Sequence, residues 1–251
     1  MTATITPLVA GNWKMNGLSA SLAEVGELAR LLTTGEAPRC TVAICPPATL
    51  LAALSQMAAS SGIVTGGQDC HPGEHGPHTG EISAAMLADA GAQYVIVGHS
   101  ERRRDHAESD DLVRRKALAA MGAGLQPIIC LGESEVERRE GRAEEVVAAQ
   151  FEHSVPEEAA QMPVVIAYEP VWAIGTGLTP TSEDILAMHA MLRTRLTGKF
   201  GDRGARTRIL YGGSMKPANA HEIMRLDNVD GGLVGGASLL ANDFYAIISA
   251  V

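Results

Sequence analysis

Short apolar runs alternate along the chain with longer stretches whose apolar residues recur at helical spacing. Residues 164–168 are an example of the first kind, because this apolar, β-branched run is what a fully buried parallel strand requires. Such runs predict eight strands, at residues 7–12, 41–45, 63–69, 94–98, 125–131, 164–168, 208–212 and 229–234. A helical pattern follows each strand, at residues 19–32, 48–60, 83–90, 111–121, 135–153, 182–197, 217–225 and 237–249.

Eight successive strand–helix units in 251 residues predict a closed (β/α)8 barrel. We expect residues 1–251 to form a single domain, because no proline- or serine-rich linker and no change in composition marks a boundary. A hydrophobic content of 46% is ample for one large core. Barrels of this kind carry their functional side chains at the C-terminal ends of the strands.

Several predicted helix ends carry residues that suit the position. Ser83 and Thr181 stand where N-caps are expected, and Asp184 follows Thr181 at the spacing of a capping box. Gly91 and Gly122 each follow a helical pattern, as glycines at helix C-termini do. These residues predict where the third and sixth helices begin and where the third and fourth end.

Composition excludes two classes of partner. The formal net charge is −9 and the pI is about 5.4, which argues against a nucleic-acid surface or an anionic membrane. No apolar run is long enough to span a bilayer, and no basic segment precedes the first strand as a secretory signal requires. Cys40, Cys45, Cys70 and Cys130 lack C-x-x-C spacing, so we expect reduced thiols and a cytoplasmic protein.

The stretch Y-E-P-V-W-A-I-G-T-G, residues 168–177, places a carboxylate at the end of a strand. Pro170 stops the strand and holds Glu169 in extended geometry, while Gly175 and Gly177 allow large backbone rotations. The apolar residues between Pro170 and Gly175 could cover a small ligand. Taken alone, Glu169 would be an exposed surface carboxylate. Beneath an apolar cover its pKa would rise, as a general base near neutral pH requires.

Two further polar groups follow predicted strands. Lys14, in G-N-W-K-M-N, comes just after the first strand, and Asn12 beside it could donate a neutral hydrogen bond. His99, in V-G-H-S-E-R-R, closes the fourth strand where a helix begins. Because the positive end of a helix disfavours an imidazolium, we expect His99 to stay neutral and to donate one N–H. Either residue alone would more often be solvent-facing or structural.

Glycine-rich runs follow the seventh and eighth strands, at residues 211–214 and 231–236. Without a Cβ, their backbone N–H groups can close on an oxyanion, and a helix opening at Gly236 would add its positive end. Barrels bind phosphate after these two strands, although a tight turn without a ligand is an alternative for each run. Neither run matches G-x-G-x-x-G or a P-loop, so no dinucleotide or ATP is expected.

Three histidines share a loop in which metal binding has to be weighed. His71, His75 and His78 are close in sequence to Asp69 and Cys70, but their spacing is not that of a helix face. Prolines and glycines between them indicate a long loop. We therefore expect a structural or interface loop here rather than a metal site.

Taken together, five segments resemble the triosephosphate isomerase family over essentially the whole chain. They are G-N-W-K-M-N, V-G-H-S-E-R-R, Y-E-P-V-W-A-I-G-T-G, Y-G-G-S and G-G-L-V-G-G-A-S-L, and they occur in this order at predicted strand ends. The resemblance implies a TIM barrel that interconverts dihydroxyacetone phosphate and D-glyceraldehyde 3-phosphate through an enediolate, in glycolysis and gluconeogenesis. It implies neither a cofactor nor a metal.

Position by position, the resemblance also implies a role for each polar group. Glu169 would remove the proton beside the substrate carbonyl, His99 would polarise that carbonyl, and Lys14 with Asn12 would stabilise the negative charge. Backbone N–H groups would hold the substrate phosphate, and they belong to Gly175, Ser214, Gly235 and Gly236.

A homodimer is a further implication of the resemblance. The loop at residues 73–80 would enter the neighbouring subunit and bring Thr79 near that subunit's Lys14. Here the sequence departs from the family, because Pro77 and His78 stand where a small residue and an aromatic ring are usual. Gly232 likewise replaces a larger apolar residue. We expect these departures to affect the strength of the dimer more than the chemistry.

Three other functions share part of the pattern. An isomerase for a phosphorylated tetrulose would carry the same motifs. A Schiff-base aldolase needs a buried lysine on a barrel strand, and no predicted strand contains one. A barrel that only binds phosphate has no need for Glu169, His99 and Lys14 together.

Overall fold

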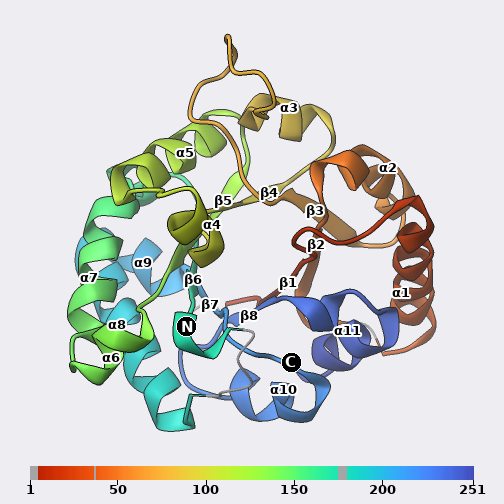
Figure 1. Ribbon diagram of the computed structural model, residues 1–251. Helices are drawn as coiled ribbons and strands as arrows, with labels where there is room; N and C mark the ends of the chain where they lie inside the picture. The colour runs from red at the N-terminus through yellow and green to blue at the C-terminus, as the bar shows by residue number, and fades with distance from the viewer. Residues whose placement is uncertain (1–4, 37, 175–179) are drawn as a thin grey trace.

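Eight parallel strands form a closed barrel in the computed structural model, which describes residues 5–36, 38–174 and 180–251 (Figure 1). Each strand pairs with the next along the chain, and β8 pairs with β1. The strands are β1 (Leu8–Asn12), β2 (Thr41–Cys45), β3 (Ile63–Gly67), β4 (Tyr94–Val97), β5 (Gln126–Leu131), β6 (Val165–Tyr168), β7 (Arg208–Tyr211) and β8 (Gly231–Val234). The (β/α)8 barrel predicted from the sequence is therefore confirmed.

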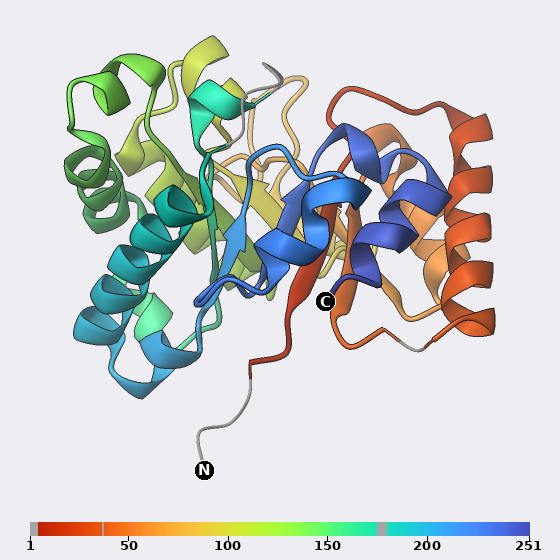
Figure 2. The same ribbon diagram turned by 90° about the horizontal axis from the view of Figure 1, so that it is seen from below.

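Helices surround the barrel on its outer side (Figures 1 and 2). The α-helices are α1 (Leu22–Thr34), α2 (Ala48–Ala58), α3 (Ala84–Asp89), α4 (Ser100–Asp105), α5 (Asp110–Gly122), α6 (Glu135–Arg139), α7 (Ala143–Ser154), α8 (Ser182–Phe200), α9 (Asp202–Arg206), α10 (Pro217–Met224) and α11 (Ala241–Ile248). Short 3-10 helices are η1 (Ser19–Ser21), η2 (Glu157–Ala160), η3 (Val171–Ala173) and η4 (Gly236–Ser238). Among the described residues, none of the helices has the length and apolar character needed to cross a membrane.

The core has two layers, one on each side of the strands. Leu8 and Ala10 of β1 belong to a cluster that fills the barrel, whereas Val9 between them belongs to the layer packed against the helices. All three side chains are fully buried. Burial on both faces explains why the strands are unbroken apolar runs rather than alternating ones.

The barrel closes where β8 meets β1, and Gly231 permits that contact. Its φ is +131°, a conformation that residues with side chains rarely adopt. A Cβ at this position would overlap the carbonyl oxygen of Leu8 in the neighbouring strand. The hydrogen-bonded pairing of Leu8 with Gly231 therefore requires glycine.

Several helix boundaries differ from the prediction. The predicted helix 135–153 is two helices, α6 and α7, because Gly141 takes a φ of +73° between them. Residues 100–105 form α4, the helix expected to begin at His99, although the predicted helical range 111–121 did not include it. The predicted helix 237–249 begins only at Ala241, after the short helix η4. β2 has its predicted bounds, and each of the other strands differs from the prediction by one or two residues at one end.

Two of the predicted caps are confirmed by hydrogen bonds. The Ser83 hydroxyl accepts from the Met86 backbone N–H at 3.3 Å. Thr181 and Asp184 exchange two bonds at 3.1 and 3.2 Å and form the expected capping box.

The two predicted C-terminal glycines have different outcomes. Gly91 follows α3 with a φ of +95°, as expected. The assignment of Gly122 was wrong, because this residue is still helical and Gly124, with a φ of +79°, makes the turn. The pattern alone does not reveal which of two nearby glycines takes the left-handed conformation.

Gly204 and Gly198 offer a matched test of the packing between α8 and α9. A Cβ at Gly204 would overlap the carbonyl oxygen of Leu196, whereas a Cβ at the exposed, helical Gly198 meets nothing within 4 Å. We expect Gly204→Ala to lower the free energy of unfolding by about 1–3 kcal/mol. Gly198→Ala should raise it by roughly 0.5–1 kcal/mol. Urea denaturation measures both, and equal effects of the two substitutions would contradict this account.

Candidate active site

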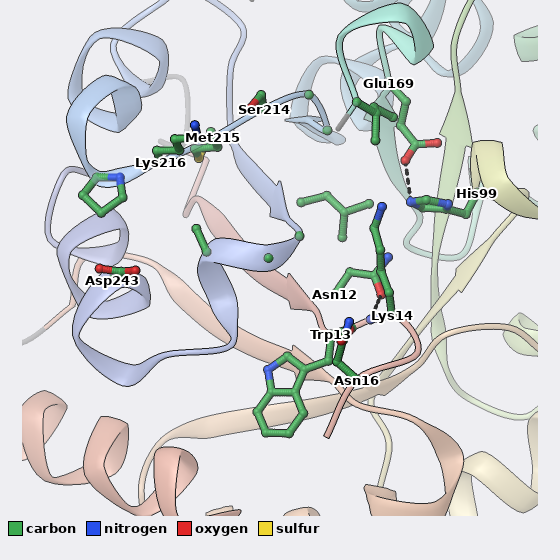
Figure 3. A pocket seen from close by; sticks show the side chains of 18 residues that line it. Asn12, Trp13, Lys14, Asn16, His99, Glu169, Ser214, Met215, Lys216 and Asp243 are labelled. Atoms are coloured by element: carbon green, nitrogen blue, oxygen red, sulfur yellow. Dashed lines mark hydrogen bonds and ion pairs between the residues drawn. The ribbon is translucent and has the colours of Figure 1, made fainter. Parts of the chain in front are cut away.

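One cavity of about 560 Å³ opens at the C-terminal ends of the strands (Figure 3). Side chains from the ends of β1, β4 and β6 and from the loops after β7 and β8 line it. The residues of interest are Asn12, Lys14, His99, Glu169, Ser214, Gly235 and Gly236. Every predicted site residue that the structure describes therefore faces the same cavity, while Gly175 lies outside the described residues.

Glu169 is buried directly after β6. Its backbone N–H donates to the Leu131 carbonyl at 2.8 Å, so the strand pairing with β5 continues into the site. The side chain is only 2% exposed, and a Cβ at Gly212 would lie 2.9 Å from its Cγ. A Cβ at Gly132 would overlap the Glu169 carbonyl oxygen. Two glycines in neighbouring loops thus leave the room that this carboxylate occupies.

Both carboxylate oxygens of Glu169 have partners. Oε1 lies 2.9 Å from His99 Nε2, and Oε2 accepts from the Ser100 backbone N–H at 2.8 Å (Figure 3). Burial alone would raise the pKa of Glu169, but His99, the Ser100 N–H and the charge of Lys14 together hold it below its ordinary value. Burial acts on this pKa as expected, but the expected net rise was wrong, because donors from segments far away in the sequence outweigh burial.

His99 is the N-cap residue of α4. Its Nδ1 accepts from the Glu101 backbone N–H at 3.2 Å, so a ring with its single proton on Nε2 fits both of its contacts. Burial lowers the pKa of His99, but the charge and hydrogen bond of Glu169 outweigh burial and raise it. This direction is opposite to the one expected from the helix end, which favoured the neutral imidazole, because Glu169 comes from β6 and is not near His99 in the sequence.

Lys14 has a backbone conformation unusual for a residue with a side chain. Its φ is +53°, and the Asn12 side-chain oxygen accepts from its N–H at 3.0 Å. Gln68 donates to its carbonyl oxygen at 2.8 Å. The ammonium group lies 2.5 Å from Glu101 Oε1, and Figure 3 shows the side chain pointing toward Glu169 and His99. Several contacts thus hold a locally strained lysine in place, as is common at functional sites.

On the other side of the cavity lie the loops after β7 and β8. Ser214, Gly235 and Gly236 all line the cavity there. The helix expected to open at Gly236 is the three-residue η4, and the Ser238 hydroxyl donates to the Gly235 carbonyl at 2.7 Å. These loops therefore present backbone groups, but a 3-10 turn replaces the predicted α-helix start.

Gly232 stands where the family usually has a larger apolar residue, and the packing of Met215 explains this difference. A Cβ at Gly232 would lie 2.9 Å from Sδ and from Cε of Met215, which is buried and also lines the cavity. The methionine side chain therefore occupies the space that a larger residue at position 232 would need. Two positions seventeen residues apart in the sequence thus compensate each other in volume.

The sequence reading missed two buried or half-buried carboxylates near the site. Glu101 belongs to the quoted V-G-H-S-E-R-R segment, but only the fold brings it to Lys14. Glu133 is fully buried and accepts from Tyr168 at 3.1 Å and from the Trp172 indole at 2.8 Å. Trp172 belongs to η3, at the start of the predicted lid. No local signal distinguishes Glu133 from the many surface glutamates of the chain.

The histidine loop is ordered by local contacts. The rings of His71 and His78 stack with centroids 4.0 Å apart, and His71 Nδ1 accepts from the Gly73 N–H at 2.9 Å. Residues 74–80 are exposed, and Figure 1 shows the segment between β3 and α3 projecting from the barrel. Within the described ranges, no three histidine, cysteine or acidic side chains are grouped so as to hold a metal ion.

Comparisons with known proteins agree with this arrangement. A model of the family described as triosephosphate isomerase matches residues 7–251. The chain is 57% identical over 251 residues to the triosephosphate isomerase of Afipia carboxidovorans, covering 100% of this chain and 99% of the relative. It is 53% identical over 250 residues to that of Rhizobium etli, covering 100% and 98%.

A solved structure extends the agreement to three dimensions. The crystal structure of triosephosphate isomerase from Bartonella henselae superposes with a TM-score of 0.90 at 45% sequence identity, covering 98% of this chain and 99% of that one. Fold, site and sequence similarity thus lead to one conclusion: the chain belongs to the triosephosphate isomerase family.

Proposed function

We propose that this chain interconverts dihydroxyacetone phosphate and D-glyceraldehyde 3-phosphate, as a cofactor-free aldose–ketose isomerase of glycolysis and gluconeogenesis. The observation that carries the proposal is the convergence of Glu169, His99 and Lys14 on one cavity whose far side is formed by Ser214 and the 235–236 glycines. A base, a neutral donor and a cation are the groups needed to form and hold an enediolate.

The chemistry assigns one step to each group. Glu169 takes the proton from the carbon next to the substrate carbonyl, while His99 Nε2–H donates to the carbonyl oxygen that becomes negative. The Lys14 ammonium, supported by Asn12, stabilises that charge. His99 then carries a proton from the hydroxyl oxygen of the enediolate to the former carbonyl oxygen, and Glu169 returns its proton to the neighbouring carbon. These two transfers give the isomeric product with no atom gained or lost.

Holding the phosphate is the task of backbone N–H groups in our proposal. Those of Ser214, Gly235 and Gly236 lie across the cavity from Glu169, and Gly175 would add its own from the segment outside the described residues. Glycine allows such close approach, because no side chain separates the backbone from the phosphate oxygens. The reacting carbons are thereby kept between Glu169 and His99.

The pairing of Glu169 with His99 has to change for catalysis to begin. A carboxylate engaged by His99 Nε2 and the Ser100 N–H is a weakened base, since both contacts lower its pKa. A substrate carbonyl oxygen competes for the same Nε2–H. Binding of substrate thus frees one oxygen of Glu169 and raises its basicity where the proton is to be removed.

We also propose that residues 1–251 form one domain and act as a homodimer in the cytoplasm. The exposed loop 74–80 and the 96% exposed Met15 next to Lys14 support the dimer, since a partner's loop reaching Lys14 would cover that apolar side chain. All four cysteines, each in the described part of the chain, are buried and unpaired, as a reducing compartment favours.

Replacing the base should abolish turnover without unfolding the protein. We expect Glu169→Gln to slow isomerisation by at least ~10²-fold. Proton NMR of dihydroxyacetone phosphate in D₂O, with both proteins in parallel and no added metal or nucleotide, measures the reaction. Wild type alone should give glyceraldehyde 3-phosphate with deuterium at the reacting carbon. An active Glu169→Gln enzyme would refute the role of the base, and an inactive wild type would refute the substrate.

The pKa of Glu169 should respond to His99. In His99→Gln the interactions that lower this pKa are weakened, while burial, which raises it, remains. We therefore expect the Glu169 carboxyl to titrate at a higher pH in the variant than in wild type. Carbon-13 NMR of the labelled side-chain carboxyl measures both. An unchanged or lower pKa in His99→Gln would contradict the assigned coupling.

Subunit association should depend on the exposed loop. Thr79→Arg would place a second positive charge beside Lys14 of the partner subunit, and like charges in a buried interface repel each other. We expect wild type to sediment as a dimer at micromolar concentration and the variant to shift toward monomer with lower kcat. Glu145→Gln on the outer face of α7 serves as the control and should remain dimeric. A wild-type monomer with full activity would overturn the proposed dimer.

A further inference from the structure

A second cavity, of about 370 Å³, lies at the opposite end of the barrel from the active site. Its wall includes Thr6 just before β1, Gln126 at the start of β5 and Arg208 at the start of β7. It therefore lies at the end of the barrel where the strands begin, which is the end that points down in Figure 2. Arg203 and Arg206 of α9 complete a group of three arginines around it, and no acidic residue of the described ranges lines it.

The acceptors that hold Arg208 are all neutral among the residues that the structure describes. Its Nε donates to the Thr6 carbonyl at 2.7 Å, and its two terminal nitrogens donate to the Tyr94 hydroxyl at 3.0 Å and to the Thr41 hydroxyl at 3.4 Å. These bonds fix the guanidinium across the starts of several strands without neutralising it. A guanidinium has five N–H donors, so further donors stay available.

Arg203 and Arg206 add charge from the short helix α9. A terminal nitrogen of Arg203 donates to the Gln161 carbonyl at 2.8 Å, while its Nε is buried and has no acceptor among the described residues. An unpaired buried donor is unfavourable unless a partner satisfies it. Arg206 is exposed beside it, so its side chain can turn toward the cavity.

The three arginines also lack carboxylate partners. Within the described part of the chain, none of them has an acidic oxygen within ion-pair distance, whereas the nearby Arg193 pairs with Asp230 at 2.6 Å. The charge of Arg208 does act on Asp230 over a longer distance, where it helps to lower a carboxyl pKa that burial raises. Three unpaired cations at one cavity contrast with the net charge of −9 of the whole chain.

We propose that this cavity is a binding site for a small molecule that carries two or more phosphate groups. Guanidinium groups bind phosphate through paired N–H donors, and several of them together select for multiple negative charges. A volume of about 370 Å³ is larger than a single phosphate needs, and Ile5, Pro163 and Val164 provide apolar wall for an organic part. A bound molecule of this kind supplies the counter-charge that the three arginines lack. Its site is separate from the catalytic cavity.

The test titrates inorganic tripolyphosphate by calorimetry at low ionic strength into wild type and two double variants. Arg203→Gln/Arg206→Gln removes two arginines of the cavity. Arg114→Gln/Arg115→Gln removes the same formal charge from exposed side chains of α5. Competitive inhibition of isomerisation, measured on each protein, reports separately on tripolyphosphate bound at the active site.

We expect one binding event of wild type to weaken by roughly tenfold or more in the first double variant and to stay unchanged in the second. The inhibition constant should agree within about twofold among all three proteins, because the active site is untouched. Arg206→Gln alone should weaken the same binding event by a smaller factor. Because this variant alters only an exposed side chain, its result is independent of the packing of Arg203.

Three outcomes would overturn the proposal. The cavity variants could bind tripolyphosphate as tightly as wild type, or the α5 variant could lose as much affinity as they do. Wild-type binding could also be fully accounted for by the inhibition constant. None of these results depends on which substrate the protein isomerises. The proposed isomerase function is tested separately, by the experiment with Glu169→Gln.

Discussion

The closure of the sheet between β8 and β1 is the contact on which the other features depend. It requires the backbones of Leu8 and Gly231 to approach closely, and only a glycine with a positive φ fits there. Once closed, the barrel has no sheet edge, and all eight strands end on one rim. Side chains separated by more than two hundred residues then share a single cavity.

Within that cavity the main tension is electrostatic. A carboxylate as buried as Glu169 is costly unless donors surround it, yet each donor that stabilises the charge also weakens the base. His99 lies at the centre of this conflict, because its Nε2–H is the donor that both Glu169 and a substrate carbonyl can use. In the proposed reaction, exchange of that one hydrogen bond links substrate binding to the activation of Glu169 as a base.

The two ends of the barrel handle positive charge differently. At the C-terminal end, Glu101 pairs with the charge of Lys14, and the strained backbone of Lys14 fixes the direction of its side chain. One cation is thereby held at a single place in the cavity. At the N-terminal end, Arg208 is bonded to neutral oxygens and keeps its full charge. The first arrangement suits a single reacting oxyanion, and the second suits a ligand with several charges.

Eight short apolar runs that alternate with helical patterns fit few other folds, so the order of residues alone predicts the barrel, and it puts Glu169, His99, Lys14 and the glycine runs at strand ends, where barrels carry their sites. The direction of the Glu169 pKa, the partners of Lys14 and Glu133, and the grouping of arginines where the strands begin become visible only in the folded chain. Strand and helix patterns are local and survive in the order of residues. Charge interactions depend on the distances between groups that closure of the barrel brings together. The spacing of residues along the sequence does not predict those distances.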